Sequence, residues 1–224
     1  MIGKMVLVTA LLAATAAVAQ EPDKGATPDQ IAAAKAIADR IIGAADAGGI
    51  FVNTTDSAMA EVTHVASGMV CVFDGGPEDR ISIFPTQGGD IPRGEDVGCV
   101  SRDEAVDIDI TLYATRYRPL PSEETVLASA GQAIQNRWPD AKVYGGDLPK
   151  MSFESRGPTL LAAYRVRLEG GEKLTMALVS HRDGWGFKAR ATGPFEDAMA
   201  VSMYTGVVFE GALADREGEA ARNP

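Results

Sequence analysis

The residues that could do acid–base or nucleophilic chemistry are few, because the chain has only two histidines. His64 and Ser67 stand three positions apart at the expected end of a strand, where a nucleophile and its general base can meet. Ser180 and His181 are adjacent on one expected strand, so their side chains point to opposite faces. No G-x-S-x-G motif occurs. The sequence therefore favours a non-enzymatic protein with no catalytic residue, and an envelope hydrolase that uses His64 and Ser67 is the alternative.

Residues that could bind a metal ion are also sparse. The two histidines are far apart, and neither an H-E-x-x-H motif nor an EF-hand spacing occurs. Asp103, Glu104, Asp107 and Asp109 form an oxygen-rich group of the kind that attracts calcium. Strand alternation places Asp107 and Asp109 together on a face where water solvates them. We therefore predict neither a metal site nor a cofactor.

Acidic residues outnumber basic ones in this chain: 31 aspartates and glutamates against 21 lysines and arginines give a net charge of −10. This balance disfavours nucleic acid, since phosphate binding needs a basic surface. Cations nevertheless recur at alternate positions of three expected C-terminal strands. We predict that one sheet face gathers them into a docking surface for an anionic protein or envelope component, unless internal carboxylates neutralise it. The predicted partner-binding residues are Arg165, Arg167, Lys173, His181, Lys188 and Arg190.

The first nineteen residues predict a secretory signal peptide. A positive start is followed by a short apolar run and by the small-x-small cleavage site Ala17-Val18-Ala19. We expect a flexible leader at 20–26, one domain at 27–213 and a flexible tail at 214–224. The run is too short for a transmembrane anchor, so we expect a periplasmic or secreted protein.

The two cysteines, Cys71 and Cys99, have the even count of an exported chain that forms a disulfide. A metal site would need more ligands or a close C-x-x-C spacing. The sequence therefore predicts that these two residues are joined and hold the expected strands together.

Three helices are expected from capping signals and apolar spacing. The first begins at Thr27, with Pro28 next and Gln30 completing a capping box. The second begins after Ser122 and ends before Pro139, and the third runs from Phe195 to about Leu213. Expected strands cover residues 50–53, 61–66, 69–73, 80–84, 97–101, 106–117, 142–144, 159–168, 173–182 and 185–192. The fold class is therefore α+β, a mixed or mostly antiparallel sheet with helices packed on one face.

Two hairpins link the last three strands. Matching their apolar faces predicts a three-residue loop, Glu169–Gly171, which sets Val166 opposite Leu174. The Asp183-Gly184 turn predicts a two-residue loop that sets Leu178 opposite Ala189.

The C-terminal region resembles the PsbP-like arrangement. The meander ends with Gly186-Phe187-Lys188-Ala189-Arg190-Ala191-Thr192, and Gly193-Pro194 and a long expected helix follow. In that family a similar closing sheet and helix belong to non-enzymatic exported accessory proteins. The resemblance covers residues 150–215 and implies a non-catalytic accessory role, with no site residue carried over.

Overall fold

The computed structural model describes residues 25–85, 92–149, 152–153 and 157–214. The predicted signal peptide lies outside them, as do most of the predicted leader and tail. Within the described part, the chain folds into three helices: α1 (Pro28–Ala44), α2 (Glu123–Arg137) and α3 (Ala198–Ala212). None of these helices is long and apolar enough to cross a membrane.

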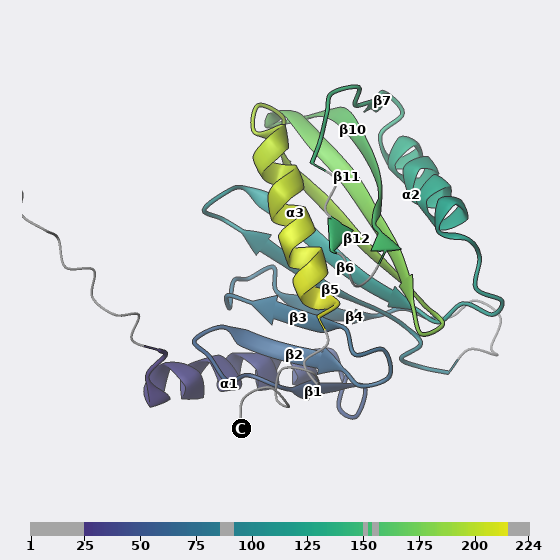
Figure 1. The fold of residues 1–224 in the computed structure, drawn as a ribbon. Coiled ribbons are helices and arrows are strands. Elements are labelled where there is room, and N and C mark those ends of the chain that lie inside the picture. Colours follow the sequence, from purple (N-terminus) through teal and green to yellow (C-terminus); the bar gives the residue numbers. More distant parts are fainter. Residues whose placement is uncertain (1–24, 86–91, 150–151, 154–156, 215–224) are drawn as a thin grey trace, which may run out of the picture.

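The strands of the described residues form antiparallel sheets (Figure 1). A small sheet has the order β1-β2-β3, a large one the order β4-β5-β6-β12-β11-β10-β7, and β8 pairs with β9. Their bounds are β1 Phe51–Asn53, β2 Ala60–His64, β3 Val70–Phe73, β4 Arg80–Ile83, β5 Asp96–Asp103, β6 Ile108–Thr115, β7 Lys142–Val143, β8 Ser152–Phe153, β9 Gly157–Pro158, β10 Leu160–Leu168, β11 Gly171–Arg182 and β12 Trp185–Pro194.

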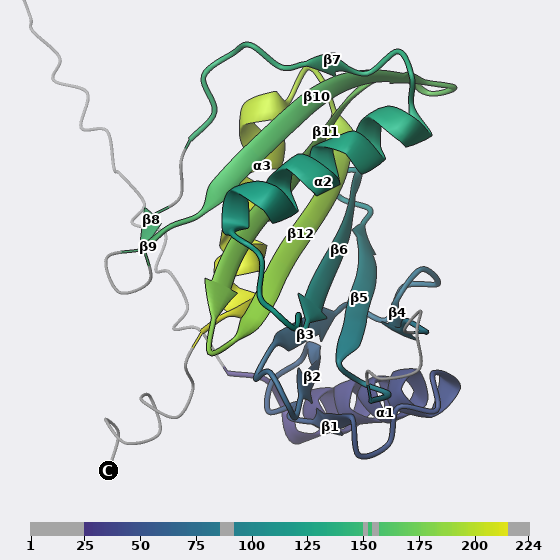
Figure 2. The same cartoon turned by 90° about the vertical axis from the view of Figure 1, so that its right-hand side faces the viewer.

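The predicted α+β fold is confirmed, but its helices cover both faces of the large sheet. Helix α3 packs on β12, β11 and β6, over the face that carries Leu174, Phe187 and Leu112. Helix α2 packs on β10 and β11 from the opposite side, where Ala130 and Ile134 contact Ala177 (Figure 2). We call these the α3 face and the α2 face.

Two helix starts and one hairpin follow the sequence closely. Thr27 accepts the Gln30 backbone N–H at 3.3 Å, while the Gln30 side chain accepts the Thr27 N–H at 2.8 Å. Ser122 accepts the Thr125 N–H at the start of α2. In the second hairpin Leu178 pairs with Ala189, which confirms the predicted register. Local signals of capping and turn geometry were therefore sufficient to predict these two helix starts and this hairpin register.

The first hairpin differs from the prediction. Its turn holds residues 169–170 alone, so Val166 pairs with Lys173 and Arg165 pairs with Leu174. The prediction assumed that the apolar face of β10 must join the apolar face of β11. On β10, Ala163 on the α3 face and Val166 on the α2 face are both buried, so alternation does not fix the register.

Two element boundaries also differ. The ladder continues past the predicted strand end, because Phe195 donates its backbone N–H to the Glu172 carbonyl at 3.2 Å, and α3 begins only at Ala198. Strand β6 begins at Ile108 instead of residue 106, because Asp107 has φ 54° in the preceding turn. Asp107 is therefore a turn residue and not part of an alternating strand face.

The predicted disulfide is confirmed and joins the two main sheets. Cys71 on β3 and Cys99 on β5 are bonded, with their Cα atoms 6.3 Å apart. Both side chains are buried. Helix α1 packs on β1, β2 and β4, so the bond lies in a region where the small sheet, α1 and the large sheet share one core.

The turn between β3 and β4 buries a carboxyl group. Asp79 is 8% exposed; its Oδ2 accepts the Gly75 N–H at 2.7 Å, while its Oδ1 has no hydrogen-bond partner among the described residues. Burial raises the pKa of Asp79 from 3.8 to about 6, and the nearby Asp74 carboxylate adds to the shift. Since the folded pKa is the higher one, Asp79 stabilises the fold below pH 4 and loses this contribution as the pH rises through 6.

We therefore expect Asp79→Asn to raise the free energy of unfolding at pH 7.5 by about 1 kcal/mol. The amide carries no charge and can donate a hydrogen bond toward Asp74. Urea unfolding at pH 7.5 and pH 5 measures the effect, which should shrink at pH 5, where the native carboxyl is protonated. Asp56→Asn, at an exposed position, is the control, and an equal gain at both pH values would contradict the assignment.

Candidate anion-binding site

The six predicted partner-binding residues do not share one face. Four lie on the α2 face: Lys173, His181, Lys188 and Arg190. Arg165 and Arg167 lie on the α3 face, because they pair with Leu174 and Glu172 on β11. The single basic face predicted from the sequence is therefore wrong, and the cause is the shifted register of the first hairpin.

On the α2 face, the Asp107 carboxylate neutralises Lys173, at one end of the cation row. Lys173 contacts the Asp107 carboxylate, which Arg102 also contacts. These two cations hold the pKa of Asp107 below its usual value. The backbone N–H of His181 donates to Glu123 Oε1 at 2.6 Å. Lys173 is thus engaged inside the fold and is not free to dock a partner.

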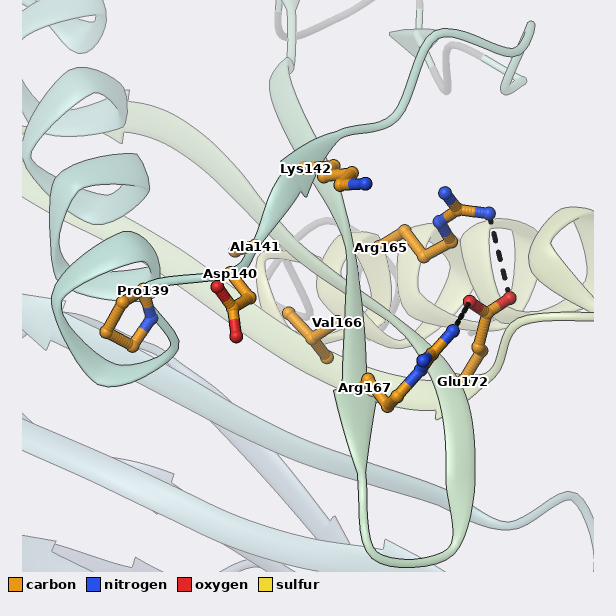
Figure 3. Close-up of a pocket in the computed structure, with 8 residues that line it drawn as sticks. All are labelled: Pro139, Asp140, Ala141, Lys142, Arg165, Val166, Arg167 and Glu172. Atoms are coloured by element: carbon orange, nitrogen blue, oxygen red, sulfur yellow. Dashed lines mark hydrogen bonds and ion pairs between the residues drawn. The ribbon is translucent and has the colours of Figure 1, made fainter.

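Arg165 and Arg167 meet a third cation at the other edge of the sheet. With Lys142 and Glu172 they line a cavity of about 490 Å³, which we call the corner pocket (Figure 3). The Glu172 carboxylate lies between the two arginines, 3.1 Å from Arg167 Nη2 and 3.7 Å from Arg165 Nη1. Its remaining lining residues are Pro139, Asp140, Ala141 and Val166.

Strand pairing places these charges together. β7 pairs with β10 so that Lys142 stands directly opposite Arg165, an arrangement of like charges that destabilises a sheet. The Arg165 guanidinium also lies 5.4 Å from the Phe195 ring centre, which fixes its direction. Among the described residues, no carboxylate pairs with Lys142. Three cations therefore line the pocket with two carboxylates, Asp140 and Glu172, and Glu172 pairs with the two arginines.

Only some of the residues that line the corner pocket can be predicted from the sequence. The sequence indicates Arg165 and Arg167 as binding residues but does not indicate Lys142 and Glu172. Lys142 lies in a two-residue strand whose partner no local pattern identifies, and Glu172 reaches Arg167 only in the observed register. One signal is present: Arg165 and Arg167 are two positions apart on one strand face, and Glu172 follows just after the turn.

The alternative pair, His64 and Ser67, does meet. Ser67 Oγ lies 2.7 Å from His64 Nδ1, and His64 Nε2 lies 2.9 Å from the Gly94 carbonyl, to which it donates. The imidazole is 1% exposed, lies between Phe51 and Trp185, and has its pKa lowered by burial. Ser67 Oγ also accepts the Met69 N–H. Both groups thus close the β2–β3 turn and anchor the segment before β5.

The acidic group considered for calcium is engaged by an arginine. Arg102 contacts Asp107 and, at 2.9 Å, Asp109, while Asp103 accepts the Ala105 N–H. Within the described ranges, no group of three or more potential ligands is arranged to hold a metal ion. The carboxylates therefore serve the fold through the protein's own cations.

No family model matches the chain, and no curated protein matches it. Among solved structures, it is similar to the crystal structure of LpqN, which is involved in cell envelope biogenesis of Mycobacterium tuberculosis. The two are 16% identical, the TM-score is 0.33, and the match covers 62% of this chain and 86% of LpqN. A likeness of this size carries no argument about function.

Proposed function

We propose that this chain is an exported, non-catalytic binding protein that docks an acidic segment of a partner protein at the corner pocket. Lys142, Arg165 and Arg167 supply the binding cations. The proposal concerns a carboxylate-bearing partner, because the pocket already holds the carboxylate of Glu172.

The position of Glu172 is the observation that supports this proposal. A glutamate between two arginines marks a place where a carboxylate accepts hydrogen bonds from guanidinium groups. The side chains of Arg167 and Arg165 are 80% and 41% exposed, so a partner can reach them. Lys142 adds a cation for a second carboxylate. In a chain of net charge −10, such a local excess favours an acidic partner at this place.

Export is part of the proposal and has separate support. Disulfides persist in oxidising compartments, and the Cys71–Cys99 bond fits such a compartment. The predicted signal peptide agrees with it. The strands β10, β11 and β12 and helix α3, on which the resemblance to the PsbP-like arrangement depends, are present. Assignment to that family stays a prediction.

A hexaglutamate peptide with a fluorescent label tests the pocket by anisotropy at low salt. We expect the triple variant Lys142→Gln, Arg165→Gln, Arg167→Gln to weaken binding about tenfold, since it removes the contacts and their charge. Glu172→Gln should tighten binding several-fold, because it removes the internal competitor. Added salt should weaken binding by the wild type.

The matched control removes three cations elsewhere: Arg80→Gln, Arg93→Gln, Arg118→Gln. These arginines are exposed and belong to other ion pairs. Because three cations are replaced in each variant, the two variants have the same change in net charge. We expect the affinity of the control variant for the peptide to stay within about twofold of the wild type, because only the long-range electrostatic field changes and salt screens it. Equal losses in the two triple variants, or no binding by the wild type, would contradict docking at the corner pocket.

A further inference from the structure

The α2 face has a second half that helix α2 does not cover. Helix α2 lies in front of β10 and β11, whereas no helix of the described residues lies in front of β6 and β5 (Figure 2). We call the α2 face of β12, β6 and β5 the open half. Its side chains form rows across the strands: Lys188 stands beside Tyr113, and Arg190 beside Thr111.

Two cations lie next to each other on the open half. Lys188 and Arg190 are two positions apart on β12, so they point to the same face. The Lys188 ammonium lies 4.3 Å from the centre of the Tyr113 ring. Burial and the neighbouring Arg190 lower the pKa of Lys188, while Asp96 acts against this. The two cations thus repel each other at a place where water is partly excluded.

Among the carboxylates of the described residues, Asp96 offsets the charge of Lys188 only in part. Asp96 is the carboxylate that acts on Lys188, and its Oδ1 already accepts the Thr115 hydroxyl at 2.9 Å. Arg190 is half-buried, and its Nε atom is shielded from solvent without any acceptor among the described residues. Leaving a buried donor of a charged group unpaired is costly, so an acceptor that reaches this guanidinium would stabilise it.

The surroundings of the two cations are aromatic and apolar. Phe84 and Tyr113 have ring centres 5.8 Å apart, with planes that differ by 24°. Both rings meet over Gly98, where an added Cβ atom would lie 3.2 Å from Phe84 and 3.4 Å from Tyr113. Val100 stands next to Thr111 on the same face. A ligand that reaches Arg190 therefore also covers apolar surface.

We propose that the open half binds a small organic acid, with its carboxylate on Arg190 and Lys188 and its apolar body against Phe84 and Tyr113. The guanidinium presents paired donors that fit a carboxylate, and the neighbouring ammonium adds charge. The rings exclude a bare, strongly hydrated anion and favour one with an apolar body. This site lies on the opposite face from the corner pocket and does not depend on it.

Benzoate serves as the probe, followed by NMR of the arginine Nε–H groups in the full chain. The Arg190 signal is identified as the one that Arg190→Lys removes. We expect benzoate to shift it in a saturable manner, with a dissociation constant on the order of 1 mM. Benzyl alcohol lacks the charge and should not shift it. Inorganic phosphate lacks the apolar body and should bind at least tenfold more weakly.

Calorimetric titration of variants completes the test. Lys188→Gln and Arg190→Gln should each weaken benzoate binding about tenfold. Arg102→Gln, on the same face but paired with Asp107 and Asp109, should leave it unchanged, as should the corner-pocket triple variant. Urea unfolding verifies that each variant is folded. If a variant is not folded, the NMR titration of the wild type alone tests the proposal. An unsaturable Arg190 shift, or phosphate binding as tightly as benzoate, overturns the proposal.

Discussion

Replacing both Cys71 and Cys99 with alanine is expected to lower the free energy of unfolding by about 3 to 4 kcal/mol. The two cysteines are 28 positions apart, and opening this loop restores chain entropy to the unfolded state. The bond also ties β3 of the small sheet to β5 of the large one. Urea unfolding of the variant against the oxidised wild type measures the loss.

Two further measurements separate the bond from the packing of its sulfur atoms. Reducing the wild type should lower its unfolding midpoint, while reductant should leave the alanine variant unchanged. The mass of the non-reduced wild type should be two hydrogens below that of the dithiol. Free thiols in the purified, non-reduced protein, or equal midpoints with and without reductant, would refute the stabilising bond.

Phe209→Ala in α3 is expected to cost about 3 to 5 kcal/mol, which is the usual effect of removing a buried aromatic ring. Phe209 is 1% exposed and belongs to the main core cluster. Helix α3 packs on β3 as well as on β6, β11 and β12, so the core to which the ring belongs is shared by both sheets. Urea unfolding monitored by circular dichroism measures the loss.

Met203→Ala on the same helix is the matched control. Its side chain is 52% exposed, and alanine keeps helix propensity high, so we expect a change below about 0.5 kcal/mol. A similar loss in both variants would mean that helix formation, and not core packing, limits stability. A small loss in Phe209→Ala would contradict the packing of α3 described above.

Local chemistry made much of the fold predictable from the sequence. The Thr27 and Ser122 caps, the Asp183-Gly184 turn and the cysteine pair depend on residues close in the chain or on composition. The α+β class followed from apolar spacing, because strands and helices have different periods. These features need no knowledge of distant partners.

The candidate sites were less predictable because they depend on register and on short strands. A shift of one residue in the first hairpin moved Arg165 and Arg167 to the face opposite Lys188. Lys142 joined them through a two-residue strand that carries no periodic signal. The His64–Ser67 contact was foreseen as a contact, but the burial of the ring depends on Trp185, which is distant in sequence.

The order of the large sheet has a consequence for how the chain folds. Its central neighbours, β6 and β12, are far apart in sequence, since Leu112 pairs with Ala189. Until β12 arrives, β6 has an open edge of backbone donors and acceptors on which another chain can pair. We therefore expect the joining of this central pair to be a step at which slow folding and intermolecular association compete.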